Sequence, residues 1–161
     1  MPGLEDLYRE IILDHYRTPR NRGELDSPPA IETNGHNPLC GDEITLYLMI
    51  DAAEKGDAAT VTDVKIGGQG CSISQSSASM MSQAVIGKTV GEARALIRRF
   101  KSLMSIEGIE LQPGDDDIPL GDLEALQGVV KFPVRIKCAV LSWNTLADAL
   151  DRATSDQSAS D

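Results

Sequence analysis

Three cysteines and one aspartate are the residues of this 161-residue chain whose types and surroundings could support metal or sulfur chemistry. Cys40 and Asp42 lie two positions apart, with Gly41 between them and an Asn-Pro pair shortly before them. Because glycine and proline interrupt regular structure, we predict a tight, exposed turn over residues 34–42 that directs both side chains to one point. Taken alone, the stretch is more typical of a structural turn, because free cysteine is often simply buried.

Each of the other two cysteines is expected near the start of a helix. Cys71 follows the glycine-rich run 67–70 and precedes small residues that predict a helix ending near Val85. At a helix N-terminus, free N–H groups and the helix dipole favour a thiolate. Cys138 lies in the first turns of a last helix that begins near Phe132. The glycine-rich run could instead bind phosphate, but it lacks the P-loop lysine and the full glycine pattern of a dinucleotide site.

These residues are candidates for a metal site, although the cysteine spacing alone is not diagnostic. The cysteines are 31 and 67 positions apart, which matches no zinc-finger spacing, and no Cys-x-x-Cys occurs. A loop and two helix starts can nevertheless meet at one end of a small domain. Zinc would then find a tetrahedral set of three thiolates and one carboxylate in Cys40, Asp42, Cys71 and Cys138.

Such a site would keep an excess of negative charge, which nearby cations could temper. Arg135 and Lys137 flank Cys138, and an ordinary solvent-facing role explains them equally well. The odd number of cysteines, in a chain whose first residues lack the basic and apolar regions of a signal peptide, argues against a disulfide framework. A cytoplasmic location is therefore expected.

Composition narrows the function classes further. The net charge of −10 argues against nucleic acid as a partner, because phosphates repel an acidic protein, and it suits a partner with a basic patch. No apolar run approaches the roughly 20 residues that span a bilayer, so no membrane partner is expected. The length fits one domain, which we place at residues 1–153, followed by a disordered tail at 154–161 because the tail lacks apolar residues that could hold it.

Hydrophobic periodicity predicts an α+β fold with a small, about three-stranded antiparallel sheet packed against about five helices. Strands 43–51 and 61–66 should form a hairpin, after a short extended piece near Ile31. Helices are expected at 4–16, from 72 to 85, after the capping box Thr89–Glu92, at 120–126, and from Phe132 onwards.

Several finer expectations follow from the same patterns. Thr62, Val64 and Ile66 should share one face of their strand, and Val134 should lie on the inward stripe of the last helix with Cys138. His15, near a helix end, should be partly exposed. The acidic segment 106–121 should be a solvated surface loop.

Three ordered motifs also resemble those of a known family. The runs N-P-x-C-G-D, G-x-G-C-x-I-S-x-S-x-x-S-M-M and R-I-K-C-A-x-L-x-W resemble the three cysteine motifs of the IscU/NifU-N/SufU superfamily of iron–sulfur cluster assembly. The resemblance covers almost the whole chain, from Leu4 to about Leu150. The chain is most similar to SufU-type members, since Lys137 replaces the histidine that precedes the third cysteine in scaffold-type IscU. A SufU-type extra segment spans residues 102–130, and the chaperone motif L-P-P-V-K is absent, with residues 131–135 in its place.

The resemblance implies a zinc-dependent sulfurtransferase that accepts persulfide sulfur from a PLP-dependent cysteine desulfurase of the SufS type. It implies that Cys40 is the acceptor, and that a histidine of the desulfurase replaces Cys40 on zinc. It also implies a downstream cluster scaffold as a second candidate partner. The zinc ligands would be Cys40, Asp42, Cys71 and Cys138.

Two other functions stay open at this point. The first is a scaffold that assembles a [2Fe–2S] cluster on the same cysteines, against which the missing histidine counts. The second is a structural zinc domain that acts only as an interaction module.

Overall fold

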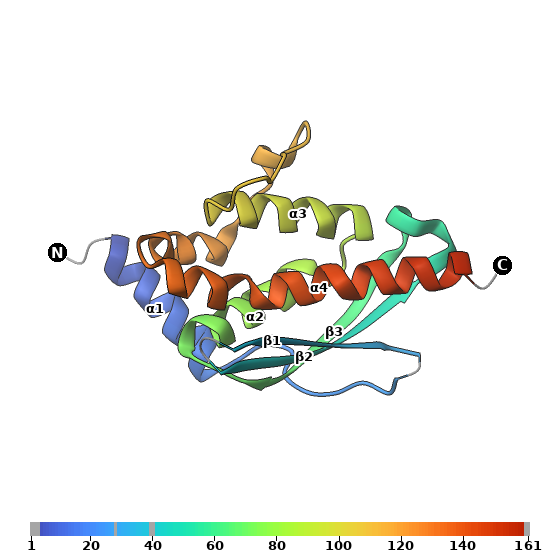
Figure 1. Ribbon diagram of the computed structural model, residues 1–161, viewed down its shortest axis with the longest axis horizontal. Coiled ribbons are helices and arrows are strands. Elements are labelled where there is room, and N and C mark those ends of the chain that lie inside the picture. Colours follow the sequence, from blue (N-terminus) through green and yellow to red (C-terminus); the bar gives the residue numbers. More distant parts are fainter. Residues whose placement is uncertain (1–3, 28, 39–40, 160–161) are drawn as a thin grey trace.

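A three-stranded antiparallel sheet forms one side of the molecule, in the order β1-β2-β3 (Figure 1). The computed structural model describes residues 4–27, 29–38 and 41–159. The strands are β1 (Ile31–Asn37), β2 (Asp42–Asp51) and β3 (Thr60–Gln69). The predicted hairpin of residues 43–51 with 61–66 is confirmed as β2 and β3, with the 3-10 helix η1 (Ala53–Ala58) between them.

The turn predicted over residues 34–42 is shorter than expected. Asn34 to Asn37 belong to β1 and pair with β2, where Asn37 lies opposite Asp42. Only the four residues between these two strand ends remain for the connection, and residues 39 and 40 lie outside the described residues. The sequence underestimates β1 because Asn and Gly are poor strand formers, whereas pairing with β2 supplies the backbone hydrogen bonds here.

The face predicted for β3 is wrong at Thr62. Met49 pairs with Asp63 but Ile50 pairs with Val61, so Thr62 is the extra residue of a β-bulge and lies exposed. A one-residue insertion reverses the side-chain alternation, which places Val61 rather than Thr62 in the core with Val64 and Ile66.

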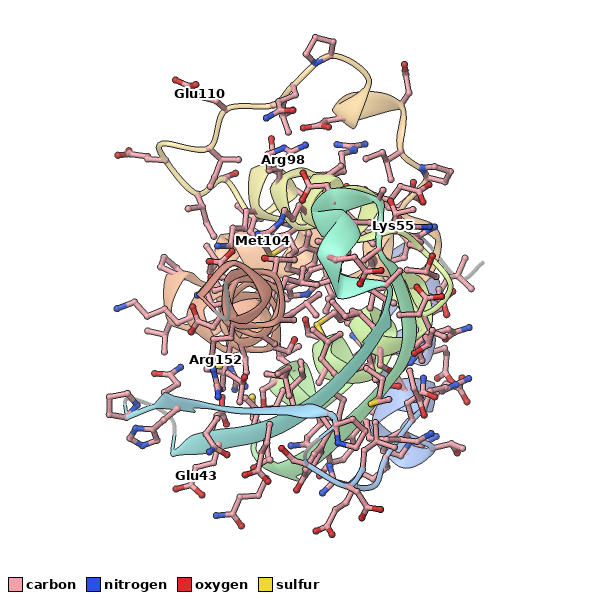
Figure 2. The ribbon with its side chains drawn as sticks, turned by 90° about the vertical axis from the view of Figure 1, so that its right-hand side faces the viewer. Glu43, Lys55, Arg98, Met104, Glu110 and Arg152 are labelled. Atoms are coloured by element: carbon pink, nitrogen blue, oxygen red, sulfur yellow. The ribbon has the colours of Figure 1, made fainter. Side chains whose placement is uncertain are left out.

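Helices cover one face of the sheet in two layers. The α-helices are α1 (Leu4–Arg17), α2 (Ser72–Val85), α3 (Val90–Leu103) and α4 (Pro133–Ala159), and the longest 3-10 helix is η3 (Gly121–Lys131). Helices α2 and α4 contact the sheet and each other, while α1 and η3 pack at the end where α4 begins. Figure 2 looks along α4 and shows it between the sheet and α3, with Arg152 directed towards β1, where it donates to the Glu32 carbonyl and to Thr33 Oγ1. The predicted α+β architecture is confirmed.

The core is closed by aliphatic side chains and one aromatic pair. Trp143 of α4 stacks on Phe100 of α3, with ring centroids 4.5 Å apart, and both are fully buried. The predicted capping box is present: Thr89 and Glu92 exchange hydrogen bonds at the start of α3. These contacts hold α3 on the outer side of α4.

Helix α4 differs from expectation at both ends. Val134 is 58% exposed, because Pro133 is the first helical residue and the first turn projects beyond the core. The helix continues to Ala159, past Thr154, whose hydroxyl bonds back to the Leu150 carbonyl. The division into a domain of residues 1–153 and a disordered tail at 154–161 remains a prediction. Within the described ranges, no helix has the length and apolar character needed to cross a bilayer.

His15 is fully buried, which corrects the expectation of partial exposure. Its Nδ1 lies 2.8 Å from Ser79 Oγ of α2, and its Nε2 lies 2.8 Å from Asp122 Oδ2 of η3. The three side chains have the hydrogen-bond order of a hydrolase triad, but Ser79 is 2% exposed, so no substrate can reach its hydroxyl. The network instead joins α1 to α2 and η3. Sequence periodicity missed it because η3 is distant in the chain.

The acidic segment after α3 is not simply solvated. Asp115, in the 3-10 helix η2 (Asp115–Asp117), is buried and accepts two hydrogen bonds from the Arg98 guanidinium, at 2.7 and 3.2 Å. The Arg98 side chain, helped by the Gln112 N–H, holds the pKa of the Asp115 carboxyl below its ordinary value, although burial acts in the opposite direction. This ion pair fixes the loop to α3.

Replacing Asp115 with asparagine should lower the free energy of unfolding at neutral pH by about 1–3 kcal/mol, because Arg98 loses a charged, buried acceptor. Since the folded-state pKa of Asp115 is depressed, its contribution is complete above the unfolded pKa of about 3.9 and is lost as pH falls through the folded value. Urea unfolding at neutral and acidic pH measures both effects. The exposed Asp117, changed to asparagine, is the matched control and should be nearly neutral. If Asp115→Asn lowered the free energy of unfolding as much in acid as at neutral pH, the loss would not come from the charged Asp115–Arg98 pair.

Candidate metal centre

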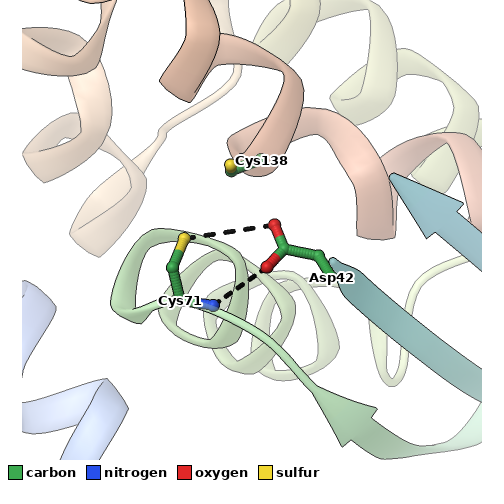
Figure 3. A group of neighbouring side chains, drawn as sticks. All are labelled: Asp42, Cys71 and Cys138. Atoms are coloured by element: carbon green, nitrogen blue, oxygen red, sulfur yellow. Dashed lines mark hydrogen bonds between the residues drawn. The ribbon is translucent and has the colours of Figure 1, made fainter. Parts of the chain in front are cut away.

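Three of the predicted ligands meet at one point (Figure 3). Asp42 comes from the first residue of β2, Cys71 is the N-cap of α2, and Cys138 lies in the second turn of α4. One ligand atom from each lies within 4.8 Å of the others. Ligands of one tetrahedral zinc are roughly 3.5–3.8 Å apart, so small side-chain rotations would bring these atoms to bonding positions. The predicted convergence of two helix starts with the turn region is confirmed for these three residues.

Asp42 is the fully buried member of the group. Its Oδ1 accepts a hydrogen bond from the Cys71 backbone N–H at 3.0 Å, and its Oδ2 lies 4.0 Å from Cys71 Sγ. Thus one carboxylate oxygen is held by the backbone while the other faces the thiols. No ion pair among the described residues includes Asp42. A buried carboxylate without a countercharge is costly, and a divalent cation held with the two cysteines would supply that charge.

Gly70 allows this close approach. A Cβ at position 70 would lie 2.6 Å from Asp42 Oδ1 and would also collide with Ser74 Oγ. Ser74 in turn donates to the Cys71 carbonyl, which steadies the first turn of α2. The glycine before Cys71 is therefore needed for its small size, a role that the sequence analysis did not assign to the run 67–70.

Gly41 is needed for its conformation instead. Its φ of +68° lies in the left-handed region, and no atom lies within 4 Å of the position that a Cβ would take. The backbone can therefore turn into β2 directly before Asp42. This explains the glycine of the Cys-Gly-Asp motif in terms of backbone geometry.

Cys138 is 1% exposed and has polar neighbours on two sides. The Asn37 side-chain amide donates to its Sγ at 3.9 Å, and its thiol lies 3.8 Å from the Val134 carbonyl. Sequence reasoning gave Asn37 no role, although the residue lies inside the first motif. An amide donor next to a sulfur stabilises negative charge there, which suits a thiolate ligand.

Among the described residues, Arg135 and Lys137 are not members of this group. Cys40 lies outside the described residues, so its part in the site remains a prediction. Arg135 and Lys137 are exposed, and neither forms an ion pair with Asp42 in the part of the chain that the structure describes. The fit to a metal therefore rests on the buried carboxylate and the two thiols.

Comparison with known proteins agrees with the motifs. The zinc-dependent sulfurtransferase SufU of Bacillus subtilis is 50% identical to this chain over 144 residues, which is 89% of each protein. The iron–sulfur cluster assembly scaffold protein IscU of Streptococcus pyogenes is 40% identical over 158 residues, covering 98% of this chain and 91% of that protein.

Solved structures share the fold. FiSufU of Fervidobacterium islandicum, whose crystal structure is described as that of an iron–sulfur cluster assembly scaffold protein for the SUF system, is 35% identical to this chain, with a TM-score of 0.73 over 92% of this chain and 99% of that one. The model of the family described as the NifU-like N terminal domain matches residues 7–139. The chain therefore belongs to the NifU-like N-terminal domain family, within the IscU/NifU-N/SufU superfamily that its three cysteine motifs predict.

Proposed function

We propose that this protein is a zinc-dependent sulfurtransferase that accepts persulfide sulfur from a SufS-type, PLP-dependent cysteine desulfurase for iron–sulfur cluster biogenesis. The observation that supports it most is the buried Asp42 carboxylate, which faces two thiols without a countercharge among the described residues. The similarity to Bacillus subtilis SufU, at 50% identity over most of both chains, supports the same activity.

The proposed zinc ligands are Asp42, Cys71, Cys138 and Cys40. Asp42, Cys71 and Cys138 converge in the structure. The pairing register of β1 and β2 supports Cys40 as the fourth ligand. Asn37 and Asp42 are directly opposed in the β1–β2 ladder, and both contact other members of the site, so both ends of the short connection that includes Cys40 lie at the metal centre. Zinc, when bound there, would keep the cysteine thiols ionised at neutral pH.

Cys40 is proposed as the sulfur acceptor. Its thiolate attacks the outer sulfur of the desulfurase persulfide, a new S–S bond forms on Cys40, and the S–S bond to the desulfurase cysteine breaks. The desulfurase cysteine leaves as a thiolate, and the sulfur moves without net oxidation. Cys138 is less suited to this step, because it is 1% exposed inside a helix and no partner thiol can approach it in line. Cys71 is fixed by its backbone bond to Asp42.

The alternative function is a scaffold that assembles a [2Fe–2S] cluster on the same cysteines. The similarity to Streptococcus pyogenes IscU favours it. The two functions differ in a simple observation. A sulfurtransferase should purify colourless with about one zinc per chain, whereas a scaffold should turn brown on anaerobic reconstitution and pass its cluster to an apo acceptor.

Changing Cys40 to alanine should abolish stimulation of the desulfurase, because no thiolate remains to take the sulfur. In the unmodified protein, incubation with desulfurase and cysteine should add about 32 Da, one sulfur atom, to the peptide that contains Cys40. Peptide mass spectrometry locates the adduct. If Cys40→Ala stimulated normally while Cys138→Ala did not, the acceptor would be Cys138 and our assignment would be wrong.

Changing Gly70 to alanine should weaken zinc binding by about tenfold or more, because the new methyl group displaces the Asp42 carboxylate. Gly67→Ala is the matched control: it adds the same methyl group in the same run, where no atom lies within 4 Å of the new Cβ. Competition with a chromophoric chelator gives both affinities. Equal zinc affinities for the two variants would show that Asp42 is not a ligand.

A further inference from the structure

A groove of about 630 Å³ opens at the end of the molecule where the metal centre lies. Its walls come from α1, the first turn of α2, η3 and the first turn of α4, which gather at one end in Figure 1. Ser72 and Ile73, directly after Cys71, line one end of it. Arg135, which also lines it, lies three residues, or nearly one helical turn, before Cys138. A molecule in this groove would therefore lie beside the thiols.

The groove is lined by apolar and basic side chains. Tyr8, Ile12, Ile73, Val129 and Phe132 provide the apolar part. Phe132 keeps 60% of its surface exposed within this apolar lining, so its ring is accessible to an apolar side chain of another molecule. The volume of the groove falls in the range of 300–1,000 Å³ that is usual for ligand sites. This is about the volume of a few amino-acid residues.

Charge distinguishes the groove from the rest of the molecule. The chain has 25 acidic and 15 basic residues, yet the groove is lined by Arg9, Lys131 and Arg135 and, among the described residues, by no aspartate or glutamate. None of the ion pairs within the described ranges uses Arg9 or Arg135. Two cations without an ion-pair partner among the described residues, on a protein of net charge −10, favour an acidic occupant.

We propose that this groove docks an acidic segment of the sulfur donor, the cysteine desulfurase. An apolar side chain of that segment enters between α1 and η3 against Phe132, and its carboxylates meet Arg9 and Arg135. The inference rests on the proposed function and adds to it where the donor is held and by what chemistry. Apolar contact provides affinity, while the charges speed association and set orientation.

The groove side chains touch no reacting sulfur, so they should affect binding of the donor rather than the transfer step. Changes at Arg9 and Phe132 should raise the concentration of this protein that half-saturates the desulfurase. The maximal stimulated rate and the zinc content should stay as in the unmodified protein. Arg135 is left unchanged in the test because it lies close to Cys138.

The experiment titrates full-length, zinc-loaded protein into a SufS-type desulfurase and measures sulfide release. Arg9→Glu and Phe132→Asp should each raise the half-saturating concentration at least about tenfold, with maximal rates within about twofold. Added salt should raise the half-saturating concentration of the unmodified protein, because it screens the charges, and should raise that of Arg9→Glu much less. Arg17→Glu and Leu111→Asp are the matched controls, since both residues are exposed and neither lines the groove. The controls should behave as the unmodified protein does.

Other results would overturn the proposal. Unchanged half-saturation in both groove variants would exclude the groove, and so would a lower maximal rate at unchanged half-saturation. If sedimentation showed a dimer that Phe132→Asp dissociates, a second copy of the chain would be the occupant. If the unmodified protein gave no stimulation, the proposed function would fail, and calorimetry of binding to the desulfurase would then test the groove alone. Weaker binding of Arg9→Glu and Phe132→Asp than of the unmodified protein would support the groove as the docking site. Equal binding would overturn it.

Discussion

The burial of one carboxylate is the constraint on which the rest of this structure depends. Asp42 starts β2 inside the protein, and a charge at that depth must be satisfied by hydrogen bonds and a cation. The Cys71 N–H donates a hydrogen bond to one oxygen of the Asp42 carboxylate. Gly70 has no side chain that would collide with this oxygen. The end of β3, the start of α2 and the start of β2 thus meet at Asp42 Oδ1. The metal centre is a consequence of where this strand begins.

Close packing of α2 on α4 brings the second thiol to the same point. Helix α2 buries five serines as well as Met80, Met81 and Val85, and the small Ser77 lies where α2 contacts α4. Ser77 donates to the Ala139 carbonyl and accepts from the Trp143 indole, so its hydroxyl is fully used between the two helices. Ala139 follows Cys138 directly, and Ser77 lies six residues after Cys71. These bonds therefore fix the distance between the two cysteines as a by-product of core packing.

The sequence predicts the helices, the β2–β3 hairpin and the placement of two cysteines at helix starts, because periodicity and glycine runs are local signals. It fails where the outcome depends on distant partners. Thr62 leaves the core because a bulge forms against Met49, and His15 is buried because η3 supplies Asp122. The Arg98–Asp115 pair likewise contradicts a solvated acidic loop, since composition cannot show which carboxylate folds back. For the site, the motifs identified Asp42, Cys71 and Cys138, while Asn37 and Gly70 became visible only through contacts.

The proposed function separates the three candidate metal donors from the candidate sulfur acceptor. Asp42, Cys71 and Cys138 belong to regular elements whose positions are set by the sheet and by the α2–α4 contact. Cys40 lies in sequence between Asn37 and Asp42, and these two residues pair with each other in the β1–β2 ladder. The groove lined by Arg9, Lys131 and Arg135 opens at the same end of the molecule, so the proposed donor binding and the proposed sulfur acceptance would share one face.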